Sequence, residues 1–207
     1  MSFGKDRRTL LAVFIVLLIA FEMIAYVSTT PRQQQRFFQL FVLGANHMAA
    51  DYYPNNDPNI RLGESVRWYI GVTNLMGNAQ LAVVRIKLGN WTITPPNDLR
   101  GTPSPAPLLA EFTRFIRNSE TWEFVFAWQI IDALSVGNST RILQLGINNQ
   151  TFQLQDSSAT NGHNFRFTIE LWTWNTESQA LQFGWQVGRE HRVAWLQLWF
   201  NAATPLR

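Results

Sequence analysis

The spacing of apolar residues divides the chain into two parts of different character. Residues 10–27 form an apolar run that contains a single charge, Glu22. After residue 28 no such run recurs, and short stretches alternate between apolar and polar positions. A helix needs about 20 apolar residues to cross a hydrocarbon layer about 30 Å thick. The pattern therefore predicts one transmembrane helix over 10–29, followed by a domain built from strands.

Three basic residues precede the apolar run and two follow it. Lys5, Arg7 and Arg8 lie before it, and Arg32 and Arg36 lie after it. The positive-inside rule then predicts a cytoplasmic N-terminus. A cleaved signal peptide is the alternative, but small residues suited to cleavage are poorly placed after the run. We expect four segments: a cytoplasmic tail (1–9), a signal-anchor helix (10–29), a juxtamembrane linker (30–36) and an extracytoplasmic β-sandwich domain (37–207).

Alternation with a period of two dominates the predicted domain. Residues 66–73 and 81–88 both alternate, with turn residues between them, and this predicts a β-hairpin. Further strands are predicted at 37–43, 109–116, 122–128, 141–147, 152–154, 165–174, 181–187 and 193–200. Residues 94–107 hold five of the nine prolines and predict a loop. Many short strands without crossover helices predict an all-β fold, an antiparallel immunoglobulin-like β-sandwich.

Three stretches of the chain resemble a known family. They read FFQLFVLGANHMAADYYPNN, GESVRWYIGVTNLMGNAQLAVVRIKLGN and PSPAPLLAEFTRFIRNSETWEFVFAWQI, and they fall within residues 37–131. This part of the chain resembles the archaeal "domain of unknown function 1616" family. The resemblance implies an archaeal source and an extracytoplasmic, immunoglobulin-like domain, and it implies no catalytic residues. Many members carry several membrane helices before this domain, whereas one is predicted here.

Composition narrows the classes of partner. The chain has no cysteine, so a domain outside the cell would depend on its core rather than on disulfides. The net charge is +3, and no basic run of the kind that follows a phosphate backbone is present. We therefore expect no nucleic-acid partner.

No catalytic or metal-binding pattern stands out. The histidines His47, His163 and His191 are widely separated, and none has a second ligand at metal spacing. The segment from Asp51 to Asn59 is rich in oxygen ligands and suits either calcium or ordinary turns. No nucleophile with its base is recognisable. The glutamates Glu111, Glu120, Glu123 and Glu170 are expected to be surface charges. We predict a non-enzyme without a cofactor.

Three sequons suggest glycosylation outside the cell. They begin at Asn90, Asn138 and Asn149, and each lies beside the end of a predicted strand. Such positions are expected on surface loops, where N-linked glycans are added.

Tryptophan occurs on both faces of the last long strands. Alternation places Trp172 and Trp174 on the face that carries Arg166 and Glu170, and it places Trp195 and Trp199 beside Gln197. A sheet with tryptophan on its second face is either covered, for instance by the loop 94–107, or open to a partner. We assign four tryptophans as contacts for a protein partner or a glycan: Trp172, Trp174, Trp195 and Trp199.

Glu22 is a further candidate contact, for a partner within the membrane. A carboxylate within a spanning helix costs about 2.5–3.5 kcal/mol on insertion scales and commonly faces a partner. The alternative is that Glu22 reaches water at the outer interface or is protonated.

These observations favour a membrane-anchored interaction protein. In that interpretation the chain is an accessory subunit of an archaeal cell-envelope or membrane assembly, with its N-terminus cytoplasmic. The alternative is a carbohydrate-binding module that uses exposed tryptophans. An enzyme built on a sandwich ranks last.

Overall fold

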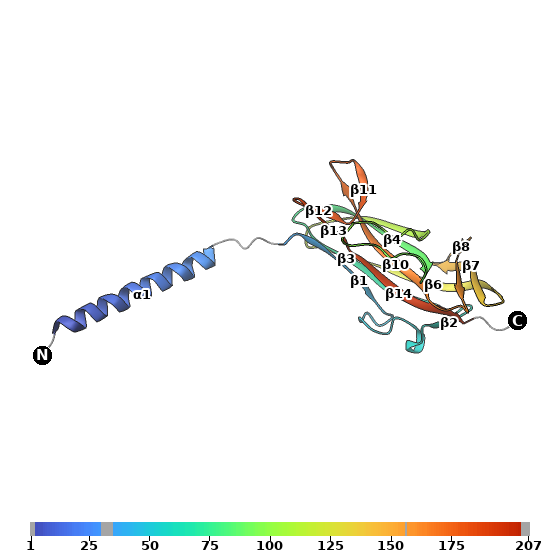
Figure 1. Ribbon diagram of the computed structural model, residues 1–207, viewed down its shortest axis with the longest axis horizontal. Helices are drawn as coiled ribbons and strands as arrows, with labels where there is room; N and C mark the ends of the chain where they lie inside the picture. The colour runs from blue at the N-terminus through green and yellow to red at the C-terminus, as the bar shows by residue number, and fades with distance from the viewer. Residues whose placement is uncertain (1–2, 30–34, 156, 204–207) are drawn as a thin grey trace. The chain divides into compact units, whose positions relative to one another are not determined.

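The computed structural model describes residues 3–29, 35–155 and 157–203, and it divides into two units (Figure 1). The first unit, 1–35, contains the helix α1 (Phe3–Thr29). Its segment Thr9–Thr29 is long and apolar enough to cross a membrane. Glu22 is exposed on this helix. Arg32, most of the expected linker 30–36, and the side chains of Lys5 and Arg8 lie outside what is described.

The second unit, 36–207, contains two main sheets that face each other. Sheet 1 has the order β1 (Phe37–Leu43), β3 (Ser65–Leu75), β6 (Thr121–Val136), β7 (Ser139–Ile147) and β8 (Gln150–Gln153), and β9 (Ser158–Thr160) also pairs with β7. Sheet 2 has the order β2 (Asn59–Arg61), β14 (Trp195–Ala203), β10 (Phe165–Asn175), β4 (Gln80–Asn90) and β5 (Leu108–Ile116), and β11 (Ala180–Phe183) also pairs with β10.

Two smaller features complete this unit: a short 3-10 helix, η1 (Pro54–Asn56), and the hairpin β12 (Trp185–Val187) with β13 (Glu190–Arg192). Neighbouring strands are antiparallel except β2, which runs parallel to β14. The predicted immunoglobulin-like β-sandwich after one apolar helix is confirmed.

Aromatic side chains fill the space between the two sheets. Trp68, Phe126 and Trp128 of sheet 1 meet Phe167 and Phe200 of sheet 2, and each is at most 1% exposed. The ring centres of Trp128 and Phe200 are 4.7 Å apart, and those of Trp68 and Phe167 are 5.4 Å apart. Such pairs contribute about 0.5–1.5 kcal/mol each beyond the burial of their surface. This core accounts for a stable domain without disulfides.

The predicted hairpin between residues 66–73 and 81–88 is wrong. β3 and β4 lie in different sheets, so the turn between them crosses the sandwich. Asn74, which is fully buried, holds this crossing: its Nδ2 donates to the carbonyl oxygens of Asn78 and Ile116, both at 2.8 Å. The error has a physical reason. Both strands bury one alternating face against the same core, and alternation does not reveal to which of the two sheets a strand belongs.

The predicted strand 181–187 is divided in two. Gly184 separates β11 from β12 and has a φ of +80°. A Cβ atom there would lie 2.0 Å from the carbonyl oxygen of Arg192. The backbone can therefore leave β10 at this point only with glycine. In Figure 1 the β10–β11 hairpin projects beyond the two sheets.

Candidate functional site

The face of sheet 2 that points away from the core carries the predicted tryptophans. We call it the outer face. The opposite face of β10 points into the core and carries four fully buried apolar residues: Phe165, Phe167, Ile169 and Leu171. The side chains of Trp172 and Trp174 therefore lie on the outer face of β10, as alternation predicted. The antiparallel register with β14 places Trp195 opposite Glu170 and Trp199 opposite Arg166 on the same face.

A buried ion pair lies at the centre of the outer face. Lys87 Nζ is 3.0 Å from Glu170 Oε2, and the two side chains are 9% and 0% exposed. Both groups also bind the loop between β4 and β5: Lys87 donates to the carbonyl oxygen of Ser104, and Glu170 accepts from the backbone N–H of Ser104 at 2.7 Å. The prediction that Glu170 is a surface charge is wrong, because this loop covers it. Glu111 and Glu123 are exposed and Glu120 is half-buried.

The loop of residues 91–107 covers more than the ion pair. Arg166 donates to the carbonyl oxygen of Ile93 at 2.5 Å. The indole of Trp195 donates to Asp98 Oδ1 at 2.5 Å. Ile93 and Ala106 also pack close to Gly89 on β4. The covering loop, considered above as an alternative to a partner, is therefore present over this half of the face.

Two polar groups under the loop have no hydrogen-bond partner in the part of the chain that is described. They are Arg166 Nε and Thr168 Oγ1, and both residues are at most 3% exposed. Burial lowers the pKa of Arg166, because desolvation disfavours its charged form. The guanidinium of Arg166 also lies 4.9 Å from the ring centre of Trp199. Trp199 is therefore engaged by a cation rather than free.

Trp172 marks the border of the covered half. The guanidinium of Arg85 lies 4.1 Å from its ring centre, and its Nε1 donates to Glu170 Oε2 at 3.0 Å. Arg85 is itself held by Glu111 at 2.8 Å. A cation over tryptophan contributes about 0.5–2 kcal/mol. Arg85 therefore covers one face of the Trp172 ring.

Beyond Trp172 the outer face is open. Phe115 pairs with Leu81, and Trp174 pairs with Leu181. Thr173 of β10 pairs with Ala82 of β4. The next two residues in this antiparallel register, Trp174 and Leu81, therefore lie side by side on adjacent strands. We call this row the apolar strip: Phe115, Leu81, Trp174 and Leu181. Phe115 is 72% exposed and Trp174 is 39% exposed. Of the four tryptophans assigned from the sequence, Trp174 is exposed and the other three are half-buried.

The three sequons differ in their surroundings. Asn90 is half-buried, and its Nδ2 donates to the carbonyl oxygen of Ser158 at 2.7 Å. Asn138 is exposed in the turn between β6 and β7. Asn149 is exposed in the turn between β7 and β8, in the left-handed region with a φ of +68°. Two of the three asparagines therefore lie on exposed turns.

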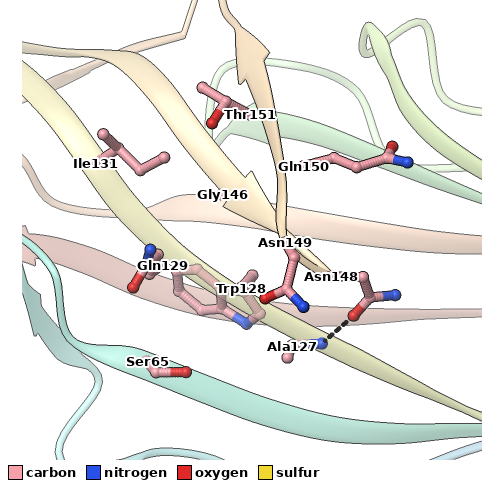
Figure 2. Close-up of a pocket in the computed structure, with 10 residues that line it drawn as sticks. All are labelled: Ser65, Ala127, Trp128, Gln129, Ile131, Gly146, Asn148, Asn149, Gln150 and Thr151. Atoms are coloured by element: carbon pink, nitrogen blue, oxygen red, sulfur yellow. Dashed lines mark hydrogen bonds between the residues drawn. The ribbon is translucent and has the colours of Figure 1, made fainter.

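A hollow of about 180 Å³ lies next to Asn149 (Figure 2). It crosses sheet 1 on the side away from the core, along a row of paired residues: Ser65, Gln129, Gly146 and Thr151. Its other lining residues are Ala127, Trp128, Ile131, Asn148, Asn149 and Gln150. None of these ten residues is ionisable. The sequence analysis found the sequon at Asn149 but not the hollow, because the other lining residues come from separate strands that meet only through pairing.

Two of the histidines, His47 and His191, and the asparagine-rich loop make local contacts. His47 stacks on Tyr69 with 3.6 Å between ring centres. His191 Nε2 lies 2.7 Å from the carbonyl oxygen of Phe183. In the loop, Asp57 Oδ1 accepts from the backbone and the side chain of Asn59 at 3.0 and 2.6 Å. Among the described residues, no three His, Cys, Asp or Glu side chains are grouped to hold a metal ion.

No protein-family model and no curated protein matches the chain. A β-glucosidase from Listeria innocua is 11% identical over 82% of this chain, which spans 17% of that enzyme, with a TM-score of 0.35. A CARDB domain from Pyrococcus furiosus, solved with di-metal ions, is 11% identical over 83% of this chain and 99% of its own length, with a TM-score of 0.36. At these values the neighbours carry no information on activity, and they support no enzyme activity.

Proposed function

We propose that the chain is a membrane-anchored interaction protein, an accessory subunit of a cell-envelope or membrane assembly. In this proposal α1 spans the membrane with its N-terminus in the cytoplasm, and the β-sandwich lies outside. The resemblance to the "domain of unknown function 1616" family favours an archaeal envelope as the setting.

The apolar strip is the observation that carries this proposal. A loop of the chain covers one half of the outer face, whereas the strip remains accessible at the other half. Exposed aromatic side chains beside arginine are typical of the centres of protein interfaces. Arg85 lies on the same face, where its guanidinium packs on the ring of Trp172, and Trp172 borders the strip. We therefore assign the strip to a protein partner.

No specific observation favours the carbohydrate-binding alternative with tryptophan platforms. Trp172, Trp195 and Trp199 are each engaged by a side chain of the same domain. The alternative stays a prediction.

The experiment places a photo-crosslinking amino acid at Phe115 of the full chain in its native host. Membranes are illuminated, solubilised in mild detergent, and analysed for a crosslinked product. Leu99 is the matched control, because it is 99% exposed on the covering loop and lies outside the strip. A single crosslinked protein at Phe115 that is absent at Leu99 supports the proposal. Equal products at both positions, or none at Phe115, would contradict it.

A further inference from the structure

The hollow beside Asn149 is built for a neutral ligand that forms hydrogen bonds. Five of its side chains, those of Ser65, Gln129, Asn149, Gln150 and Thr151, form no hydrogen bond within the described residues. Amides and hydroxyls both donate and accept hydrogen bonds, as the hydroxyls of a sugar do. With no ionisable residue in the lining, nothing selects for a charged ligand.

The floor of the hollow adds a second observation. Trp128 belongs to the strand beneath it, but its indole lies on the opposite side of sheet 1, in the core against Phe167 and Phe200. Gly146 keeps the floor low, because a Cβ atom there would lie 3.1 Å from Cγ of Gln129 and 3.2 Å from Cδ1 of Ile131.

Two adjacent asparagines in the wall have different roles. Asn148 is used by the fold: its Oδ1 accepts from the N–H of Ala127 and its Nδ2 donates to the carbonyl oxygen of Val125, both at 2.9 Å. The first of these bonds is drawn in Figure 2. The side chain of Asn149 makes no such bond to another described residue, and it lies at the hollow together with Thr151, the hydroxyl residue of the same sequon.

We propose that the first sugar of a glycan linked to Asn149 is seated in this hollow. The inference rests on the extracytoplasmic location in the proposed function. A sugar attached to the wall is held near the hollow at high effective concentration, so weak hydrogen bonds suffice to order it. The hollow is smaller than the roughly 300–1,000 Å³ of pockets for drug-sized ligands, which suits a single sugar ring.

The attachment itself needs a sugar donor linked to a lipid phosphate. The bond between the anomeric carbon and the phosphate oxygen breaks, and a C–N bond to Nδ2 of Asn149 forms. The lipid phosphate leaves with the electron pair, and the proton lost from Nδ2 balances its charge. The chain supplies only the acceptor and the seat.

The test compares variants of the full chain made in a host that glycosylates secreted proteins. Glycopeptide mass spectrometry measures the occupancy of Asn138 and Asn149, and melting temperatures are measured in detergent. Asn149→Gln removes the glycan, and Asn138→Gln is the matched control, because Asn138 is exposed on another turn and does not line this hollow. Gln129→Ala alters the seat and leaves the sequon intact. The same variants made in a host without N-glycosylation show the effect of each substitution alone.

We expect both sites to be occupied and Asn149→Gln to lower the melting temperature by about 2–4 °C, with no change for Asn138→Gln. Without glycosylation, Asn149→Gln should have only the small effect of placing Gln in a left-handed backbone position, and this effect is subtracted. After this subtraction, adding Asn149→Gln to Gln129→Ala should lower the melting temperature no further, because both remove the same contact.

Three results would overturn the inference. An occupied Asn138 with an unmodified Asn149 would show that the hollow is no glycan seat, and so would equal effects of the two Gln variants. These leave the proposed location intact. If neither site is modified, the inference fails because no glycan is present, and the proposed location is left to the crosslinking experiment.

Discussion

Both halves of the outer face of sheet 2 carry tryptophan, but the chain covers the tryptophans in one half and leaves the other half exposed. Trp172, Trp195 and Trp174 all lie on this face by strand alternation. In the covered half, Trp195 binds Asp98 of the loop, and Trp172 binds Glu170 under Arg85. In the open half, Trp174 lies in the apolar strip beside Phe115. The comparison shows that a tryptophan on an outer face is accessible to a partner only where the chain does not cover it.

The largest effect is expected at the ion pair in the covered half. Lys87→Met leaves the carboxylate of Glu170 buried without its cation. Loss of one partner of a buried pair costs about 3–5 kcal/mol, so the free energy of unfolding should fall by that amount. Denaturant unfolding of the full chain, followed by tryptophan fluorescence, measures it.

Arg114→Met is the matched control for this prediction. Arg114 pairs with Glu120 at 3.0 Å, but the two side chains are 51% and 30% exposed. Exposed pairs contribute at most about 1 kcal/mol. Equal losses for Lys87→Met and Arg114→Met would show that the loop does not seal the covered half.

A second, smaller effect separates the two tryptophans at the border. Trp172→Ala removes the ring beneath Arg85 and the hydrogen bond to Glu170, and we expect a loss of about 3 kcal/mol, at the lower end for buried aromatic residues. Trp174→Ala should cost less than half of that, because Trp174 is 39% exposed. Thermal or denaturant unfolding of both variants compares them. If the order is reversed, the boundary between the two halves is misplaced.

The smallest effect on stability is expected in the strip. Phe115→Ser should change the free energy of unfolding by no more than about 0.5 kcal/mol, as is usual for exposed positions. Leu99→Ser on the covering loop gives the baseline for an exposed apolar side chain. A loss above about 1 kcal/mol at Phe115 alone, in the same unfolding assay, would mean that the strip is already covered within the chain.

The strand faces could be predicted from the sequence, but the strand partners could not. Alternation correctly placed Trp172 and Trp174 on the same face of β10 as Arg166 and Glu170, because the side-chain period of a strand is a local property. The same alternation suggested a hairpin of β3 and β4, which belong to opposite sheets. Pairing depends on which strands become neighbours in the same sheet. Turn residues such as those after Asn74 are compatible both with a hairpin and with a connection between the two sheets.

The sequence by itself determined the apolar helix, the all-β class, the face of β10 that carries Trp172 and Trp174, and the proline-rich loop. These follow from local hydrophobic periodicity and from the restricted backbone of proline. The tertiary structure alone decided that this loop covers Glu170 and Trp195 but leaves Phe115 and Trp174 exposed. It also decided that Ser65, Gln129, Gly146 and Thr151 form one row beside Asn149. The physical reason is that such contacts join residues distant along the chain, whose meeting depends on strand order and register rather than on the residues nearby.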